Sequence, residues 1–235
     1  MVRDIEKAIA EKPKAMSKMR QVIAKRLTES FTTTPHFYAT VSVDMTGLSA
    51  FRQELKARGE SYTVTDFILE AVILSLKEFP AMNSVTDGTS LKWHSNVHLG
   101  LAVALENGLV VPPIRNAEEL SIKELHDIAR DLATRAREGK LSPDEMKGST
   151  FTVSNMGMLD VENFFAIINP GEAAILAVAS TIEKPVVING KIEVRSIMKM
   201  TLSSDHRIAD GNIAAAFVNA IKAKLQNLEL WKRLV

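Results

Sequence analysis

Near its C-terminal end the chain reads Ser203-Ser204-Asp205-His206-Arg207-Ile208-Ala209-Asp210-Gly211, between an apolar strand-like segment and a predicted helix. An imidazole flanked by two carboxylates and an arginine suits general base catalysis, because its neighbours can hold it while one ring nitrogen takes a proton near neutral pH. Gly211 permits a tight backbone where the helix begins. A capping aspartate beside a surface histidine explains the same spacing equally well, so the motif alone leaves both interpretations open.

The composition of the chain excludes several classes of protein. Its 235 residues are 46 % hydrophobic and 24 % charged, which is typical of a globular domain and excludes general disorder. The formal net charge of +1 argues against nucleic-acid binding through bulk charge. The absence of cysteine excludes disulfides, a thiolate nucleophile, cysteine-ligated zinc and iron–sulfur clusters. No apolar run reaches the roughly 18 to 20 residues of a membrane span, so we expect no membrane partner.

The rest of the sequence predicts one α+β domain around this motif. Residues 1–15 are charged and contain Pro13, and we interpret them as a linker remnant or an N-terminal arm, with the domain at 16–235. Caps, apolar periodicity and proline stops predict helices at 17–31, 48–58, 65–79, 121–139 and 212–226, and a further helix start at 142–145. Alternating and apolar runs predict strands at 36–44, 84–87, 91–94, 150–154, 173–180 and 197–203. Hairpins are predicted between 97–105 and 108–111 and between 186–188 and 191–194.

Motifs for nucleotide and metal chemistry are missing from the sequence. It has no P-loop, no Gly-x-Gly-x-x-Gly and no His-Glu-x-x-His. His94 and His98 are four residues apart, but their segment has the pattern of a strand, which would hold them too far apart to share a metal. We therefore expect no metal site.

The Asp-His-Arg-x-x-Asp-Gly motif resembles the signature of dihydrolipoamide acyltransferases, the core components of 2-oxo acid dehydrogenase complexes. The wider superfamily of coenzyme-A-dependent acyltransferases, which includes chloramphenicol acetyltransferase, shares His-x-x-x-Asp-Gly. The resemblance extends over nearly the whole chain, in the order of the family's motifs: Met19 to Ser30, Pro35-His36-Phe37, Asp66 to Asn83, Gly108 to Asn116, Phe151 to Gly157 and Ile168-Asn169-Pro170. The departures are Met156, where leucine is usual, and Gly171-Glu172 after Pro170.

The resemblance implies a fold and an assembly. We expect a chloramphenicol acetyltransferase-like mixed β-sheet sandwiched with helices, in one domain that serves as a trimeric building block. Family members place the active site between neighbouring subunits of the trimer. In the family an apolar tail, here Leu225 to Val235, joins trimers into cores of 24 or 60 subunits.

The resemblance also implies roles for individual residues. His206 matches the catalytic base, and Ser154 matches the hydroxyl that donates to the oxyanion. Asp210 matches an aspartate that fixes local structure, with Arg20 as a candidate partner. A plain strand-end serine is the alternative for Ser154.

Three further residues are expected near the coenzyme. Arg52 and Lys56 share one helix face and match basic positions near the coenzyme A phosphates, although a solvated charged face fits as well. His36 matches a position near the channel, and a purely structural hydrogen bond is equally compatible with it.

The implied substrates are coenzyme A and a lipoyl group carried on a separate domain that this chain does not contain. The implied partners are further copies of the chain, a lipoyl domain, and the 2-oxo acid decarboxylase and dihydrolipoamide dehydrogenase components, the last two bound through upstream domains missing here. The implied location is the cytoplasm if the source is bacterial and the mitochondrial matrix if it is eukaryotic.

Several alternatives stay open at this point. Acetyl is the favoured acyl group, since Asn155 to Met158, Ala174 to Val178 and Ala214 to Phe217 resemble acetyl-transferring members. The segment Val187 to Arg195 looks more like that of succinyl-transferring members, and a branched-chain acyl group is also possible. A catalytically silent structural core and an antibiotic-acetylating enzyme are rival functions. Nucleic-acid binding is a further rival hypothesis, and only the basic residues of the predicted helix near Lys18 favour it.

Overall fold

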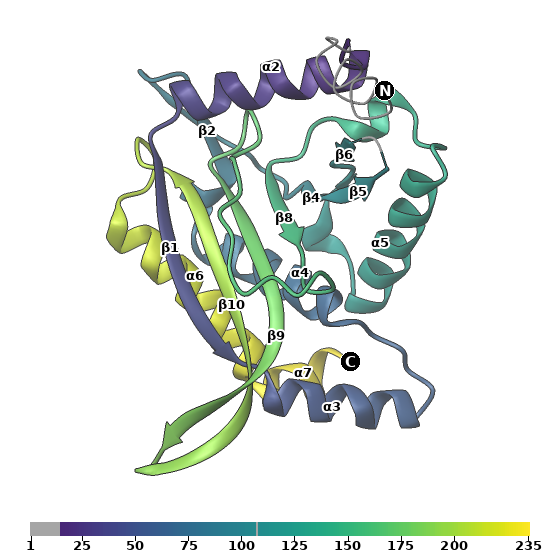
Figure 1. Cartoon of the computed structure of the whole chain (residues 1–235), viewed down its shortest axis with the longest axis vertical. Coiled ribbons are helices and arrows are strands. Elements are labelled where there is room, and N and C mark those ends of the chain that lie inside the picture. The colour runs from purple at the N-terminus through teal and green to yellow at the C-terminus, as the bar shows by residue number, and fades with distance from the viewer. Residues whose placement is uncertain (1–14, 107) are drawn as a thin grey trace, which may run out of the picture.

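The computed structural model describes residues 15–106 and 108–235, so most of the predicted linker or arm at 1–15 lies outside the described residues. A six-stranded sheet in the order β1-β10-β9-β8-β4-β7 forms the centre of the molecule (Figure 1). Its strands are β1 (His36–Asp44), β4 (Leu99–Leu101), β7 (Pro113–Ile114), β8 (Phe151–Asn155), β9 (Ala174–Ile188) and β10 (Lys191–Asp205). β8 runs parallel to β4 and to β9, while the other pairs are antiparallel. The predicted α+β class with a mixed sheet is confirmed.

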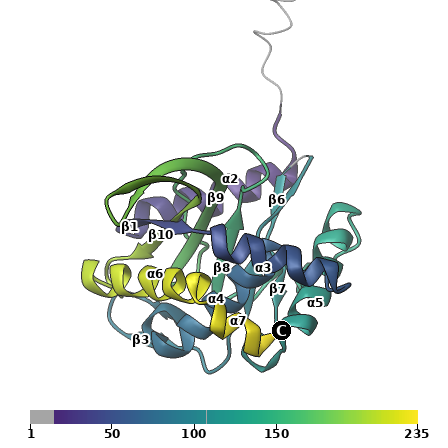
Figure 2. The same cartoon turned by 90° about the horizontal axis from the view of Figure 1, so that it is seen from below.

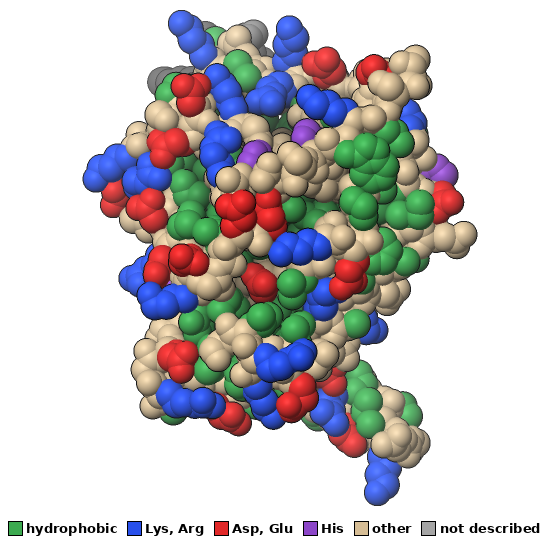
Figure 3. Space-filling view, turned by 180° about the vertical axis from the view of Figure 1, so that it is seen from behind, with side chains coloured by type: hydrophobic (Ala, Val, Ile, Leu, Met, Phe, Trp, Pro, Cys, Tyr) green, Lys and Arg blue, Asp and Glu red, His purple; other side chains and the backbone are tan. Residues whose placement is uncertain are grey.

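β9 and β10 form one long hairpin that dominates the sheet. The sequence predicted two short core strands and a separate hairpin around Asn189-Gly190, but the two pairs of segments are continuous. A bulge between Met198 and Met200 shifts the register where the hairpin leaves the body of the molecule. Beyond the bulge the side chains of β9 alternate between exposed and half-buried, which is why these residues were predicted as a separate hairpin. The tip projects from the body with exposed Val187 and Ile192 (Figure 3).

Helices cover one face of the sheet. Figure 2 shows α6, α4 and α7 below the sheet, with α3 beside them and α5 at the edge. The bounds are α2 (Lys18–Thr33), α3 (Thr46–Ala57), α4 (Val64–Glu78), α5 (Ile122–Arg137), α6 (Gly211–Gln226) and α7 (Leu228–Leu234), with 3-10 turns η1 (Pro80–Asn83), η2 (Ala117–Glu119) and η3 (Pro143–Met146). On the other face a loop crosses the sheet, where Val161 exchanges hydrogen bonds with Ser180 and Asn163 accepts one from Thr201.

The capping signals of the sequence set the helix starts. Ser121 and Glu124 form the predicted reciprocal box at the start of α5. α4 begins one residue earlier than predicted, because Thr63 and Asp66 form another reciprocal box there. The box of Ser142 with Glu145 is also present, but it caps only the single turn η3.

The predicted hairpin at 97–111 is only half right. Its first arm divides at Ala102, so that β4 joins the large sheet and β5 (Val103–Leu105) pairs with β6 (Gly108–Val110) in a sheet of two. Gly100 of β4 allows neighbouring side chains to approach closely, because a Cβ there would lie 2.7 Å from Val111 and 2.8 Å from the Thr152 hydroxyl. The strands predicted at 84–87 and 91–94 form the small hairpin β2 (Ser84–Thr86) and β3 (Leu91–Trp93).

The C-terminal tail packs within its own chain. Trp231 of α7 is fully buried, its ring meets Phe67 edge-to-face at 5.0 Å, and its indole N–H donates to the Leu225 carbonyl. The resemblance predicted that this tail joins trimers to one another. Deleting 231–235 would also remove Trp231 from the core of each chain. Whether the tail joins trimers stays a prediction.

We predict that Trp231→Ala lowers the free energy of unfolding by about 3 to 5 kcal/mol, because it leaves a large cavity beside Phe67. Leu234→Ala on the same helix is the matched control, since Leu234 is 38 % exposed and should cost less than about 1 kcal/mol. Urea unfolding followed by circular dichroism measures both. Equal losses in the two variants would contradict this account of the tail.

Glu172, in the turn before β9, is a buried carboxyl group beneath β8. Its Oε1 accepts hydrogen bonds from the Ser149 and Thr152 hydroxyls and from the Asn169 amide. Its Oε2 is buried with no partner in the described part of the chain. Burial raises the pKa of Glu172 to about 7, and it outweighs the three hydrogen bonds and the charge of Arg26, which lower it.

This carboxyl group should make stability depend on pH. The Glu172 carboxyl group ionises near pH 4.5 in the unfolded chain and near pH 7 in the folded chain. The contribution of Glu172 to the free energy of unfolding is therefore complete below about pH 4.5 and is lost as the pH rises to about 7. We predict that Glu172→Gln, which cannot ionise, is about 3 kcal/mol more stable than the parent at pH 8, with the gap closing towards pH 4. Urea midpoints across this range test it, with Glu183→Gln as a surface control. A gap that does not vary with pH would refute the prediction.

Candidate active site

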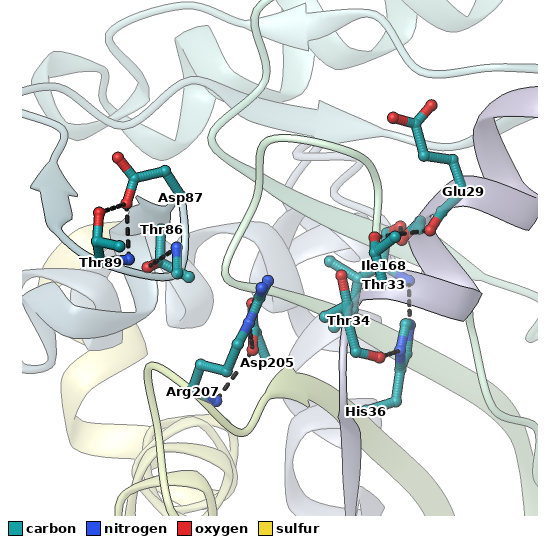
Figure 4. Close-up of polar contacts among 12 residues, drawn as sticks. Glu29, Thr33, Thr34, His36, Thr86, Asp87, Thr89, Ile168, Asp205 and Arg207 are labelled. Atoms are coloured by element: carbon teal, nitrogen blue, oxygen red, sulfur yellow. Dashed lines mark hydrogen bonds and ion pairs between the residues drawn. The ribbon is translucent and has the colours of Figure 1, made fainter.

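An ion pair holds the loop that carries His206. β10 ends at Asp205, whose buried carboxylate accepts hydrogen bonds from the Arg207 backbone N–H and, at 2.6 to 3.1 Å, from the Arg207 guanidinium. These bonds raise the pKa of Arg207 above its usual value, so the arginine stays charged. The backbone N–H groups of Ile208 and Ala209 donate to the Asp205 carbonyl. The carboxylate and arginine beside the histidine therefore fix the backbone on both sides of it (Figure 4).

The His206 ring itself is exposed and held from one side. Its backbone N–H donates to the Pro35 carbonyl at 2.9 Å, and its ring meets Phe37 edge-to-face at 5.3 Å. Strand β1, which carries Phe37, thus supports the ring while one side faces outward. This is the arrangement that a base acting on a bound substrate requires.

Asp210 is the N-cap of α6. Its Oδ1 accepts hydrogen bonds from the backbone N–H groups of Asn212 and Ile213, both at 3.0 Å. The pairing of Asp210 with Arg20 stays a prediction from the resemblance. The capping interpretation of the motif is correct for Asp210, and it fixes where the helix after His206 begins.

Ser154 lies near the end of β8 and lines a cavity of about 760 Å³. The neighbouring Asn155 donates from its amide to the Thr65 hydroxyl at 3.0 Å and accepts from the Gly157 backbone N–H at 2.7 Å. These bonds tie the strand end to the start of α4. Ser154 is half-buried in this lining.

The same cavity contains a pair that the sequence did not reveal. His126 of α5 and Asp66 of α4 are 2.8 Å apart, with only 16 % and 4 % of their side chains exposed. The ring of Tyr62 packs edge-to-face on His126 at 5.7 Å. Sixty residues separate the pair along the chain, so no local spacing signals it.

His36 has the structural role that the sequence left open. Backbone N–H groups only donate, so its Nε2 accepts from Ile168 at 3.1 Å while its Nδ1 donates to the Thr34 carbonyl at 2.8 Å (Figure 4). Both ring nitrogens therefore fasten the loop at 168 to β1. Whether His36 also lies beside a ligand stays a prediction.

Arg52 and Lys56, the predicted phosphate ligands, lie on α3 outside the lining of the cavity. The Arg52 Nε donates to the Tyr62 carbonyl at 3.1 Å. Their contact with a coenzyme stays a prediction.

Across the described ranges no three His, Asp or Glu side chains gather to hold a metal ion, and no helix is long and apolar enough to cross a membrane.

The structure does not bring Ser154 and His206 together within one chain. Ser154 lies on β8 and His206 follows the end of β10, and these two strands flank β9 and run in opposite directions. Ser154 pairs with Ala177 of β9, and Ser204 pairs with Ala174. Two strand spacings and several residues of rise separate the functional side chains by roughly 15 to 20 Å. The two predicted site residues are therefore far apart within one chain.

Comparison with known proteins shows the family of the chain. Residues 9–232 match the family model of 2-oxoacid dehydrogenases acyltransferase (catalytic domain). A mitochondrial dihydrolipoyllysine-residue acetyltransferase component of the pyruvate dehydrogenase complex from Schizosaccharomyces pombe is 42 % identical over 90 % of this chain and 45 % of its own length. The chain spans about half the length of the curated relatives that it matches.

Solved structures agree with the sequence comparison. A probable dihydrolipoamide acetyltransferase from Listeria monocytogenes has a TM-score of 0.87 and 39 % identity, over 94 % of this chain and 95 % of that one. The dihydrolipoamide acetyltransferase of Azotobacter vinelandii has a TM-score of 0.87 and 35 % identity, over 93 % and 92 %. Chloramphenicol acetyltransferase, at 16 % identity and a TM-score of 0.52, covering 86 % and 94 %, shares the fold alone. The chain thus belongs to the family of 2-oxoacid dehydrogenase acyltransferase catalytic domains.

Proposed function

We propose that this domain transfers an acetyl group between a dihydrolipoyl thiol and the thiol of coenzyme A. His206 acts as the general base and Ser154 as the oxyanion donor. The spacing of these residues is the observation that carries the proposal. The Azotobacter vinelandii acetyltransferase was investigated for the catalytic roles of a serine, a histidine 52 residues later and an asparagine four residues after that. Ser154, His206 and Asp210 have the same spacing here, with aspartate in place of asparagine.

The chemistry follows from an alkyl thiol that is mostly protonated at neutral pH. An imidazole nitrogen of His206 takes the proton from coenzyme A as the sulfur attacks the thioester carbonyl, and a new carbon–sulfur bond forms. The Ser154 hydroxyl donates to the oxygen that becomes negative, which is worth about 3 kcal/mol. When the bond to the dihydrolipoyl sulfur breaks, that sulfur takes the proton from His206. No covalent enzyme intermediate is required.

The separation of Ser154 from His206 supports a site shared between copies of the chain. The two groups must lie within about 3 Å of the same reacting thioester, which one chain does not allow. In a cyclic trimer each subunit meets its two neighbours through different surfaces, so the His206 edge of one copy can face the Ser154 edge of the next. Assembly into 24- or 60-subunit cores and the lipoyl, decarboxylase and dehydrogenase partners remain predictions from the resemblance.

Acetyl is favoured over succinyl and branched-chain acyl groups by the names of the relatives. Turnover with acetyl-, succinyl- and isobutyryl-coenzyme A tests this choice directly.

A silent structural core is the second candidate function, but an exposed His206 on a loop held by hydrogen bonds is an arrangement that scaffolding does not require. On the face seen in Figure 3, Lys and Arg are interspersed with Asp and Glu, which gives nucleic acid no continuous basic surface there.

We predict that His206→Ala and His206→Gln each lower turnover of acetyl-coenzyme A with free dihydrolipoamide at least about a hundredfold, because neither can act as the base. The bonds that hold this loop involve the His206 backbone, Asp205 and Arg207, so fold and assembly should persist. Steady-state rates and sedimentation measure the two effects. Near-normal turnover in a correctly assembled variant would refute the mechanism.

A second prediction tests the shared site. When His206→Ala and Ser154→Ala chains are co-expressed in equal amounts and assemble at random, about a quarter of the sites combine an intact histidine with an intact serine. We expect rescue to about a quarter of parental turnover, whereas each variant alone stays low. Mass spectrometry must confirm mixed trimers. No rescue in confirmed mixtures would show that each site lies within one chain.

A further inference from the structure

The loop between β8 and β9, residues 156–173, crosses one face of the sheet, and its second half is fastened to two other elements. We call this second half, residues 166–173, the latch loop. The Ser30 hydroxyl of α2 donates to the Ile168 carbonyl at 2.6 Å, and the Ile168 backbone N–H donates to the His36 ring of β1 at 3.1 Å (Figure 4). The latch loop therefore joins α2 to the edge strand β1.

The C-terminal end of the latch loop meets the strand that leads to His206. The Ala173 carbonyl accepts a hydrogen bond from the Asp205 backbone N–H at 2.8 Å. The His206 backbone N–H donates in turn to the carbonyl of Pro35, the residue before His36. The latch loop thus contributes to the support of the backbone at His206, directly through Ala173 and indirectly through His36.

Glu172 binds the latch loop to β8 through a buried side chain, of which only 5 % is exposed. Its Oε1 accepts hydrogen bonds from the Ser149 and Thr152 hydroxyls and from the Asn169 amide, and none of these partners carries a charge. Its Oε2 is buried without a partner in the described residues. An ionised Glu172 would therefore be a buried charge with neutral partners, which costs free energy that a protonated carboxyl group avoids.

Charged and titratable groups of the described chain on the neighbouring elements do not neutralise Glu172. The charge of Arg26 on α2 favours its ionisation, but Arg26 is exposed and burial of the carboxyl group has the larger effect. Arg115 donates to two backbone carbonyls, and Arg207 forms its ion pair within its own loop. Both ring nitrogens of His36 bond to the backbone. Burial therefore decides the balance and raises the pKa of Glu172 to about 7.

A second acid in the first half of the same loop has the opposite environment. Glu162 accepts hydrogen bonds from the Lys184 and Lys199 ammonium groups, which lower its pKa to about 2. It therefore stays ionised near neutral pH, where Glu172 changes its charge. Ion pairs hold the first half of the loop throughout this range, whereas the second half depends on a carboxyl group that titrates.

We propose that Glu172 is a proton-controlled latch, which keeps residues 166–173 closed while it is protonated and lets them open locally when its proton is lost. Opening places the carboxylate in water, and it disrupts only a few hydrogen bonds while the core of the sheet stays folded. It separates Ile168 from His36 and so loosens part of the support of His206. This device does not depend on the acyl transfer proposed above.

Hydrogen exchange of the assembled protein, measured by mass spectrometry from pH 5 to pH 8, tests the latch. After correction for intrinsic exchange rates, the open fraction of a peptide over 166–173 should rise about seventyfold, because the carboxyl group ionises near pH 4.5 when open and near pH 7 when closed. In Glu172→Gln, which cannot ionise, the corrected rate should not change with pH. The same rise in this variant, or no rise in the parent, would overturn the inference.

Glu162→Gln is the matched control, because it removes a carboxylate from the same loop that is ionised at every pH of the series. It should keep the seventyfold rise of the parent, to within about twofold. A rise that disappears in Glu162→Gln as well would show that the pH dependence does not belong to Glu172, and it would also overturn the inference.

Low concentrations of urea distinguish local opening from unfolding of the whole chain. At pH 8 the exchange of 166–173 should not respond to urea, whereas exchange of a core peptide over 174–182 should accelerate, because only global unfolding exposes a large surface. Equal acceleration of the two peptides in the parent would overturn the inference even if no variant could be purified. Exchange requires no substrate, so an inactive parent that shows this pattern would reject the proposed function alone.

Discussion

The pairing of β9 with a neighbour on each side is the constraint on which the rest of the structure depends. β9 binds β10 antiparallel and β8 parallel, and its first seven residues are buried. Because the two neighbours run in opposite directions, their C-terminal ends lie towards opposite ends of β9, with His206 beyond one and Ser154 near the other. A sheet with this order holds the two groups apart within one chain, which supports the proposal that two copies of the chain share the site.

Local signals in the sequence predicted much of this fold. Strand β1 has the predicted bounds, and the boxes of Ser121 with Glu124 and Ser142 with Glu145 are present as expected. These features involve residues within about four positions of one another, where side-chain chemistry and backbone geometry determine the outcome together. The histidine loop between a strand and a helix was predicted for the same reason.

The features that the sequence did not reveal are contacts between distant segments. The length of the β9–β10 hairpin depends on register across the sheet, and its outer part alternates like a separate hairpin. Asp66 and His126 meet only because α4 and α5 pack together, and the burial of Trp231 depends on the position of Phe67. Of the candidate site residues, His206 and Ser154 could be named from motifs, but their separation could not be derived before the strand order was known.

The hydrogen bonds between Asp205 and Arg207 also determine when the loop that carries His206 becomes ordered and loses its conformational entropy. Four hydrogen bonds join these two residues, and both flank His206 directly. The loop is therefore ordered during folding, when the burial of the whole core can offset the entropic cost. A substrate that arrives later has little disorder left to remove from the backbone beside the imidazole. Under the proposed function, binding energy that would otherwise go into arranging this loop remains available to align the thiol with the thioester.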